Sequence, residues 1–247
     1  MSHLSWNVFG DFTYEVKNST RFIYSDKVNN LLSAIKDSLS GRSKSFPEGT
    51  VMFRSQLGYA ENYLEDWIEI TGHPVERMKP ISGEATEGRA NSKGIPVLYL
   101  SSDENTSMAE LRPQVSQVIS CGQFSTNRTL KLVDCCSAKN NYTRLQLVFG
   151  NPKAKEEWID GIWFQINEVF SQPVVNEPNN AAYIPTQILS ELFKHSGFDG
   201  LFWKSHLASG YNYILFQPAY ADMINCKLNT TKSVNYNFEM FDEKDRL

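Results

Sequence analysis

Apolar residues that recur three and four positions apart predict helices in several parts of the chain. Such a stripe means that one helical face is covered by the rest of the fold while the opposite face meets water. The predicted helices cover residues 26–39, 152–170 and 188–193, with shorter ones around residues 63–68 and over residues 106–112.

Short apolar runs bounded by Gly, Pro, Asn, Asp or Ser predict the strands. The predicted strands are residues 50–54, 97–101, 130–134, 144–149, 200–205 and 212–217, followed by a final hairpin of residues 225–228 and 234–238. Because strands and helices are mixed along the chain, we expect an α+β fold in which a central mixed β-sheet is flanked by helices.

The segment from Glu87 to Pro113 carries the most distinctive chemistry of the sequence. A polar Gly-containing loop with Arg89 leads into the strand that holds Tyr99, and Glu110 follows eleven residues later in a short helix. A buried structural strand needs neither a basic loop nor a nearby carboxylate. The three side chains therefore mark a candidate functional site.

Three further segments accompany this one in a fixed order. Upstream, VMFRSQLG (51–58) reads as a strand that contains an Arg. Downstream, YIPTQILSELFKHSGFDGLFWKS (183–205) reads as a helix, a Gly-containing turn and a strand that ends in Ser, and NYILF (212–216) reads as the next strand. In order and spacing these pieces resemble the RES-domain toxins, a family named for an Arg, a Glu and a Ser. The resemblance extends over roughly residues 49–218.

The resemblance implies an ADP-ribosyltransferase-like fold with a pocket for NAD between elements of the sheet. It implies that Arg54, Tyr99 and Glu110 are catalytic. Arg54 would hold the pyrophosphate through paired hydrogen bonds, Tyr99 would stack on nicotinamide, and Glu110 would stabilise positive charge on the ribose. Arg89 and Ser205 are expected to bind the substrate.

Without the resemblance, each of these residues has an ordinary structural interpretation. Arg54 and Arg89 would form surface ion pairs, Tyr99 would belong to the core with its hydroxyl at an edge, and Glu110 would be a solvated helix residue. Ser205 and His206 are not expected to act as a nucleophile and its base, because neighbours on a strand point to opposite faces.

The leading functional hypothesis is a toxin or effector that cleaves the nicotinamide–ribose bond of NAD, by hydrolysis or phosphorolysis, and so depletes cellular NAD. The alternative acceptor is a protein, which would make the chain an ADP-ribosyltransferase. A second class is a non-catalytic module that binds NAD, and a third is an RNA-targeting toxin. For the leading hypothesis, the resemblance implies a separate antitoxin or regulatory protein as partner.

Composition limits these choices. The formal net charge of −4 over 247 residues argues against a general nucleic-acid binder, which usually has a basic surface. Cys121, Cys135, Cys136 and Cys226 show no CxxC spacing, so no metal site is expected. With no signal-peptide pattern and no apolar stretch of membrane-spanning length, we expect a cytoplasmic protein.

Residues 1–47 precede the region of resemblance. They are expected to form a helical extension that packs on the main domain, residues 48–247, because the apolar stripe over residues 26–39 needs a surface to cover. A separate partner-binding role for this extension, or its association with a second copy of the chain, stays open.

Overall fold

The computed structural model describes residues 4–136, 142–172, 180–235 and 237–238. Its main element is an eight-stranded sheet that is antiparallel except where β7 and β8 run parallel. In spatial order the strands are β1 (Ser43–Phe46), β7 (Leu130–Asp134), β8 (Gly200–Lys204), β9 (Tyr211–Leu215), β5 (Leu98–Ser101), β2 (Val51–Leu57), β6 (Val118–Thr126) and β10 (Ala221–Thr230). The predicted α+β fold with a central mixed sheet is confirmed.

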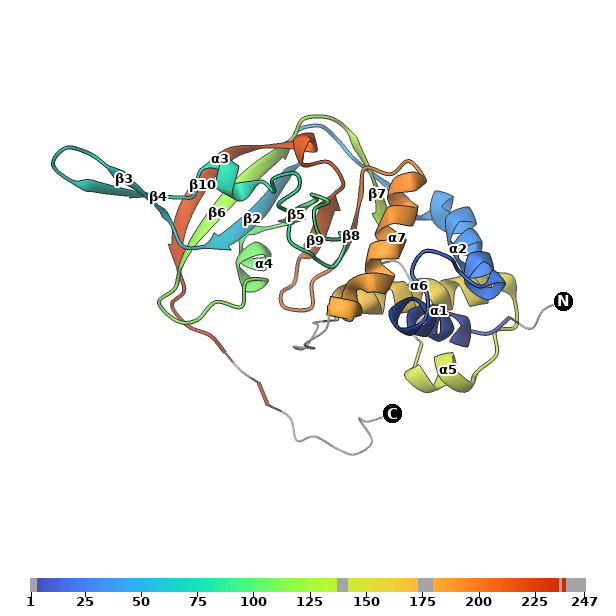
Figure 1. Cartoon of the computed structure of the whole chain (residues 1–247). Helices are drawn as coiled ribbons and strands as arrows, with labels where there is room; N and C mark the ends of the chain where they lie inside the picture. The colour runs from blue at the N-terminus through green and yellow to red at the C-terminus, as the bar shows by residue number, and fades with distance from the viewer. Residues whose placement is uncertain (1–3, 137–141, 173–179, 236, 239–247) are drawn as a thin grey trace.

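Most of the helices gather at the β7–β8 half of this sheet (Figure 1). The helices are α1 (Asn7–Asn18), α2 (Asp26–Ser38), α3 (Val75–Met78), α4 (Glu104–Ala109), α5 (Arg144–Phe149), α6 (Lys155–Ser171) and α7 (Ile184–His195). The helices α6 and α7 pack on β8, and α1 and α2 pack on α6 and α7 in turn.

The core under these helices is strongly aromatic. Trp163 of α6 is 1% exposed and stacks on Phe193 of α7, with 5.9 Å between ring centroids. The first two helices contribute Phe12 and Ile35, which are fully buried in the same cluster. The N-terminal helices therefore share one core with α6 and α7, while the division of the chain at residue 47 stays a prediction.

The opposite face of the strands carries a second apolar cluster. Leu98 and Leu100 of β5 lie in it, whereas Tyr99 packs toward the helical side, as strand alternation predicts. Phe202 and Tyr213 of the neighbouring strands stack there. Apolar side chains therefore pack on both faces of the central strands.

The sheet opens where β2 meets β5. Only Phe53 and Ser101 are paired between these two strands, although β2 pairs with β6 along its whole length, from Val51 to Leu57. Beyond that single pair, β2 and β5 separate. We call this opening the seam, and the candidate site lies there.

Two predicted elements have the wrong secondary structure. The helix predicted around residues 63–68 is instead a separate hairpin of β3 (Ala60–Tyr63) and β4 (Ile68–Thr71). The strand predicted over residues 144–149 is the helix α5, which begins with a capping box formed by Thr143 and Gln146. Both segments are short, and a short apolar run does not distinguish strand from helix by its period.

The remaining differences lie in the C-terminal segment and in elements that the sequence pattern did not predict. The predicted C-terminal hairpin is wrong: residues 225–228 lie within β10 and pair with β6, and the described residues after Thr230 are in no strand. The helix α1 and the strands β1 and β6 were not predicted. The helix α2 is capped by the Ser25 hydroxyl, which accepts from the amide of Val28.

Candidate functional site

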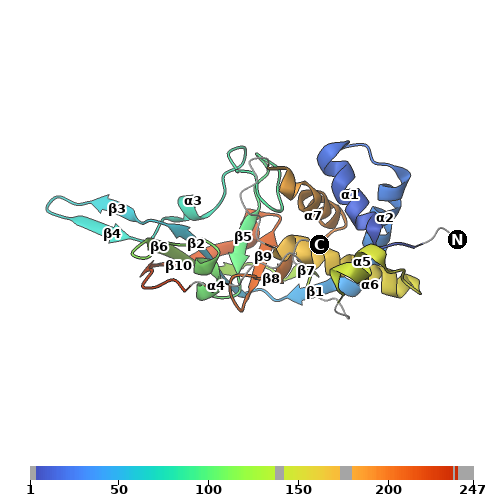
Figure 2. The same ribbon diagram turned by 90° about the horizontal axis from the view of Figure 1, so that it is seen from below.

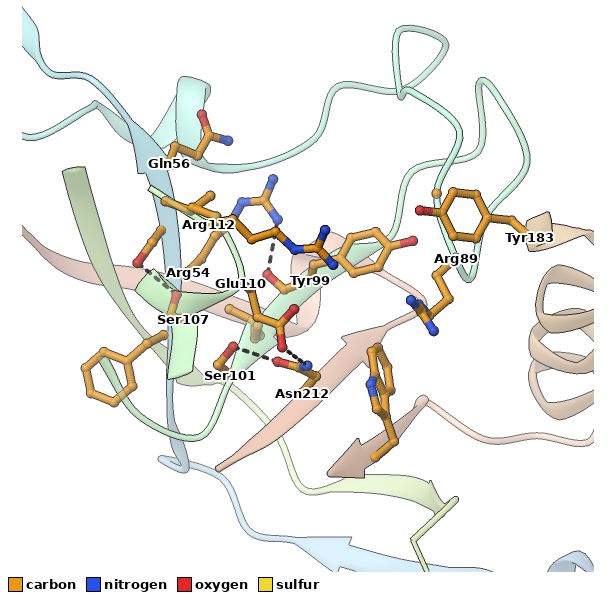
Figure 3. Close-up of a pocket in the computed structure, with 16 residues that line it drawn as sticks. Arg54, Gln56, Arg89, Tyr99, Ser101, Ser107, Glu110, Arg112, Tyr183 and Asn212 are labelled. Carbon is orange, nitrogen blue, oxygen red and sulfur yellow. Dashed lines mark hydrogen bonds between the residues drawn. The ribbon is translucent and has the colours of Figure 1, made fainter. Parts of the chain in front are cut away.

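A pocket of about 540 Å³ lies at the seam (Figure 3). Its floor comes from β2, β5, β8 and β9, one wall comes from α4 and the turn after it, and the other comes from the Arg89 loop and the residue that precedes α7. A volume of this size suits a ligand of cofactor dimensions. The residues that line the pocket include Arg54, Gln56, Arg89, Tyr99, Ser101, Glu110, Arg112, Tyr183, Trp203 and Asn212.

The pocket is cationic although the protein is acidic. Arg54, Arg89 and Arg112 line it together with Glu110, which gives three positive charges against one negative charge, or a net charge of +2. The whole chain has a net charge of −4. A local reversal of sign in a concave site raises the local concentration of anionic ligands.

Arg54 is the deepest of these cations. Its Nη1 donates to the backbone oxygen of Tyr99 at 3.1 Å, across the gap left by the missing β2–β5 pairing. Its Nε is buried without a hydrogen-bond partner, and no carboxylate pairs with it within the described part of the chain. Burial, opposed in part by Tyr99, lowers the pKa of the guanidinium, which nonetheless stays protonated. A buried cation with an unsatisfied donor is a ready site for an anion.

Glu110 is held by two donors on one of its oxygens. It caps the C-terminal end of α4, and its Oε1 accepts from Ser205 Oγ at 2.7 Å and from Asn212 Nδ2 at 2.6 Å. The amide of Asn212 is oriented by Ser101, whose hydroxyl donates to Asn212 Oδ1 at 3.0 Å. Because a carboxylate only accepts, this network fixes which end of the amide faces Glu110. The second oxygen, Oε2, accepts no hydrogen bond from the described residues.

Helix α4 is itself anchored at both ends. Asp103 caps its start by accepting from the amide and hydroxyl of Thr106, each at 2.8 Å. Burial alone would raise the pKa of Asp103, but hydrogen bonds from Thr106 and Ser102 outweigh it and lower the pKa. Further along α4, Ser107 donates to Ser55 of β2 at 2.9 Å. The position of Glu110 is therefore determined by the sheet rather than by the short helix alone.

Ser205 lies behind Glu110 instead of facing the pocket. Its side chain is buried, and its hydroxyl donates to Glu110 while it accepts from the amides of Leu207 and Ala208 at 3.1 and 3.2 Å. In this structure the Ser205 hydroxyl donates to the carboxylate of Glu110, and the expected hydrogen bond to a substrate stays a prediction.

Tyr99 is fixed at both its ring and its hydroxyl. The hydroxyl donates to Asn91 Oδ1 at 2.8 Å and accepts from the amide of Ala90 at 3.0 Å. Gly88 approaches so closely that a Cβ there would lie 2.4 Å from the Tyr99 oxygen, so the loop requires glycine at this position. Burial raises the pKa of Tyr99 to about 12, so the phenol is neutral at physiological pH.

Arg89 connects the pocket to α6. Its Nη1 donates to the carbonyls of Val169 and Phe170, at 2.8 and 2.5 Å, and its Nη2 donates to that of Gln172 at 2.8 Å. These are the unpaired carbonyls at the end of a helix, where a positive charge also meets the negative end of the helix dipole. Arg89 thus supplies charge to the pocket while most of its donors hold the fold.

The structure brings four of the five expected residues into one pocket and places the fifth, Ser205, directly behind it. Sequence reasoning missed Ser101, Asn212 and Arg112. Asn212 had a detectable signal, because in NYILF it shares a strand face with Ile214, which makes it a polar residue on an apolar face. Arg112 had none, since its left-handed backbone, with φ of 49°, follows from the turn after α4.

The described ranges hold no cluster of three or more His, Cys, Asp or Glu side chains that could bind a metal ion. None of the described helices is both long and apolar enough to cross a membrane.

The site defines a class of protein, one whose sheet opens into a cationic pocket with a single fixed carboxylate. A family model narrows the class: the RES domain matches residues 67–237, which is more than half of the chain. The chain belongs to the RES-domain family, as the motifs predicted. Arg54 lies before the first matched residue, and the fold nevertheless places its strand β2 beside β5 and β6.

The solved structures include a similar chain in the MbcT–MbcA toxin–antitoxin complex of M. tuberculosis. The identity is 11%, the match covers 80% of this chain and 92% of that chain, and the TM-score is 0.44. No curated protein matches the sequence.

Proposed function

We propose that this RES domain is an enzyme that cleaves the bond between nicotinamide and ribose in NAD. The observation that carries the proposal is the presence, in one pocket, of a fixed carboxylate and an arginine whose Nε is buried without a hydrogen-bond partner. Glu110 keeps Oε2 open toward the cavity, and Arg54 keeps a donor without a partner. A dinucleotide with a pyrophosphate and a positively charged nicotinamide ring presents matching charges for both.

Glu110 would act on the charge that develops during cleavage. As the bond from C1′ to the ring nitrogen breaks, its electron pair moves to the ring and neutralises the pyridinium, and positive charge spreads over C1′ and the ribose oxygen. A carboxylate held by Ser205 and Asn212 needs no rearrangement to stabilise that charge. Glycosidases use a carboxylate in the same relation to an oxocarbenium-like centre.

The remaining lining residues suit the two ends of such a ligand. Arg54 and Arg112 offer donors for the pyrophosphate, and Arg54 is the better placed because it is buried. The rings of Tyr99, Tyr183 and Trp203 line the same pocket and offer flat surfaces for the nicotinamide.

The acceptor decides the overall reaction. Water would give hydrolysis, inorganic phosphate would give phosphorolysis, and a protein side chain would give ADP-ribosyl transfer. In each case the acceptor oxygen or nitrogen bonds to C1′ and its proton leaves to solvent or a base. Depletion of cellular NAD by the first two reactions would make the chain a toxin, and a separate antitoxin, as in the MbcT–MbcA complex, would be its regulator.

The decisive experiment is the Glu110→Gln variant. Gln keeps the shape and can still accept from Ser205 and Asn212, but it removes the charge that opposes the developing cation. We expect the rate at which free nicotinamide is released from NAD to fall by about 100-fold to 1,000-fold. Chromatography measures this release. Circular dichroism should show an unchanged fold.

The matched control is Glu104→Gln on the same helix. Glu104 lies at the start of α4, is partly exposed and faces Lys227 at 3.8 Å rather than the pocket. Its variant should retain full turnover. Equal activity of the Glu110 and Glu104 variants would exclude the proposed role of Glu110, and NAD binding without any nicotinamide release by the wild type would indicate a non-catalytic module instead.

A further inference from the structure

The hairpin of β3 and β4 extends away from the rest of the molecule (Figures 1 and 2). Its two strands pair with each other and with no other strand that the structure describes. A two-stranded ribbon is marginally stable in water by itself. A ribbon that projects in this way therefore needs either strong anchoring at its base or a surface that covers it.

The base of the hairpin is anchored to the sheet. Ser120 of β6 donates to the carbonyl of Gly58 at 2.7 Å and accepts from the amide of His73 at 3.0 Å. The ring Nε2 of His73 lies 3.0 Å from the carbonyl of Leu57. Both ends of the hairpin are thus tied to one residue of the central sheet, so its direction is set by the fold.

One face of the hairpin is apolar and exposed. The pairing places Tyr63 opposite Ile68 and Glu61 opposite Ile70, so these four side chains share a face. Tyr63 is 75% exposed and Ile70 is 54% exposed. Next to this face, the turn exposes Leu64 and Trp67. The opposite face is polar, and there Asn62 donates to Thr71 at 3.4 Å.

The hairpin is also acidic. It carries Glu61, Glu65, Asp66 and Glu69, and no Lys or Arg occurs between residues 55 and 76. Residues 59–71 alone therefore have a charge of −4, equal to the net charge of the whole chain. Apolar side chains rimmed by charges of one sign are typical of a recognition surface rather than of a surface that only meets water.

We propose that residues 59–71 form a docking arm for a protein partner that presents an apolar surface rimmed by Lys and Arg. The negative charge of the arm favours a basic protein surface over other binding partners. Nucleic acids and anionic membranes would be repelled, and two arms packed face to face would bring eight carboxylates together. A basic protein surface satisfies both the apolar face and its acidic rim.

The arm is directly continuous with the strand that holds Arg54. Gly58 and Tyr59 alone separate β2 from β3. A partner bound to the arm is therefore attached to a strand that forms part of the pocket floor. The proposal does not depend on NAD cleavage, since it rests on the hairpin alone.

The test uses two designed peptides with the same pattern of Leu positions, one with Lys and one with Glu at every polar position. Trp67 reports binding, because it is the exposed one of the five tryptophans. We expect the Leu/Lys peptide to shift the fluorescence emission of Trp67 and to protect this emission from quenching by acrylamide. The Leu/Glu peptide should do neither. Raising the salt concentration should weaken binding of the Leu/Lys peptide.

Two arm variants and one matched control decide the outcome. Replacing Ile68 and Ile70 by Thr should weaken binding of the Leu/Lys peptide at least 10-fold, and so should the charge variant Glu61→Gln with Glu65→Gln. The control replaces Ile81 and Ile224, two exposed isoleucines outside the arm, by Thr and should bind like the wild type. Circular dichroism checks that each variant is folded.

Equal affinity of the control and both arm variants would overturn the proposal. Sedimentation of the wild type and the arm variants tests the competing occupant, a second copy of the chain. A wild-type dimer that dissociates when Ile68 and Ile70 are replaced would assign the arm to self-association instead.

Discussion

Under α6 and α7, Phe12, Trp163 and Phe170 are buried against other apolar side chains, whereas at the seam the partly buried Arg54 has its Nε enclosed without a hydrogen-bond partner and no counter-charge among the described residues. Burial of the aromatic side chains stabilises the fold by about 1.5–3 kcal/mol each. Burial of an unpaired guanidinium does the opposite. Apolar burial in the helical half thus offsets the cost of holding charged groups at the seam. Those groups are placed to bind a ligand, although they do not stabilise the fold.

The two regions should respond differently to substitution, and the largest effect on stability is expected in the helical half. Trp163→Ala removes a side chain that stacks on Phe193 and also packs under the guanidinium of Arg42, 4.7 Å from the ring centre. We expect the free energy of unfolding in urea to fall by about 3–5 kcal/mol. The folded fraction should still bind NAD.

Trp67→Ala is the control for that measurement. The same residue type is removed from the exposed turn of the hairpin, where the free energy of unfolding should change by no more than about 0.5 kcal/mol. Similar losses in the two variants would mean that the helical half is not the main source of stability.

At the seam, Arg54→Met should separate binding from stability. We expect NAD affinity to fall about 100-fold, measured by calorimetry in a Glu110→Gln background, because truncating a buried charged donor costs about 2–5 kcal/mol. The free energy of unfolding should change little, since loss of the hydrogen bond to the Tyr99 carbonyl is offset by removal of a partly buried cation that lacks a counter-charge and is repelled by Arg77. Arg54→Lys should lie between, because Lys keeps the charge without the forked geometry.

Arg128→Met is the matched control for Arg54. Arg128 is about half exposed, its Nη2 lies 4.0 Å from Asp199, and it does not line the pocket. Neither affinity nor stability should change. Loss of stability in the Arg54 variant without loss of affinity would assign Arg54 to the fold.

The same contrast explains what could be predicted from the sequence. In the helical half, the large apolar side chains of α6 repeat at helical spacing, and most of the side chains in this stripe are buried in the structure. At the seam, Tyr99 and Glu110 were identifiable because polar groups in an apolar segment are unusual. Arg112 was not, because its place depends on how a turn leaves α4.

The secondary structure of the hairpin could not be predicted from the apolar pattern. Tyr63, Leu64, Trp67 and Ile68 fit a short helix as well as a hairpin, and the choice is made by the turn, where the amide of Leu64 donates to the carbonyl of Trp67 at 2.9 Å. The network of Ser101, Asn212 and Glu110 likewise joins residues that lie more than 100 positions apart. No local pattern contains that information.

A smaller effect is expected at Ser205, where catalysis and stability can again be separated. Ser205→Ala removes one donor from Glu110, so the turnover number should fall about 10-fold while KM stays the same, in line with one hydrogen bond to a charged group. A rise in KM would show that Ser205 contacts the substrate itself. Ser196→Ala, which removes a hydroxyl bonded to the Leu192 carbonyl at the end of α7, controls for the loss of a local hydrogen bond.

The smallest effect is expected for Tyr99→Phe. The ring stays in the pocket, so NAD affinity should change little, but Asn91 and the amide of Ala90 lose their partner, at a cost of about 1 kcal/mol in the free energy of unfolding.

The pH dependence of the difference in the free energy of unfolding between the wild type and Tyr99→Phe identifies the source of that difference. Burial raises the pKa of Tyr99 from 10.0 to about 12. Because the folded state prefers the neutral phenol, the stabilisation that Tyr99 provides is complete below pH 10 and is lost as the pH rises toward 12. The stability difference between wild type and Tyr99→Phe should therefore shrink, and then reverse, over that range. Tyr213, whose pKa burial also raises to about 12, is present in both proteins and cancels. A difference that stays constant up to pH 12 would mean that the phenol reaches water and does not hold the Arg89 loop.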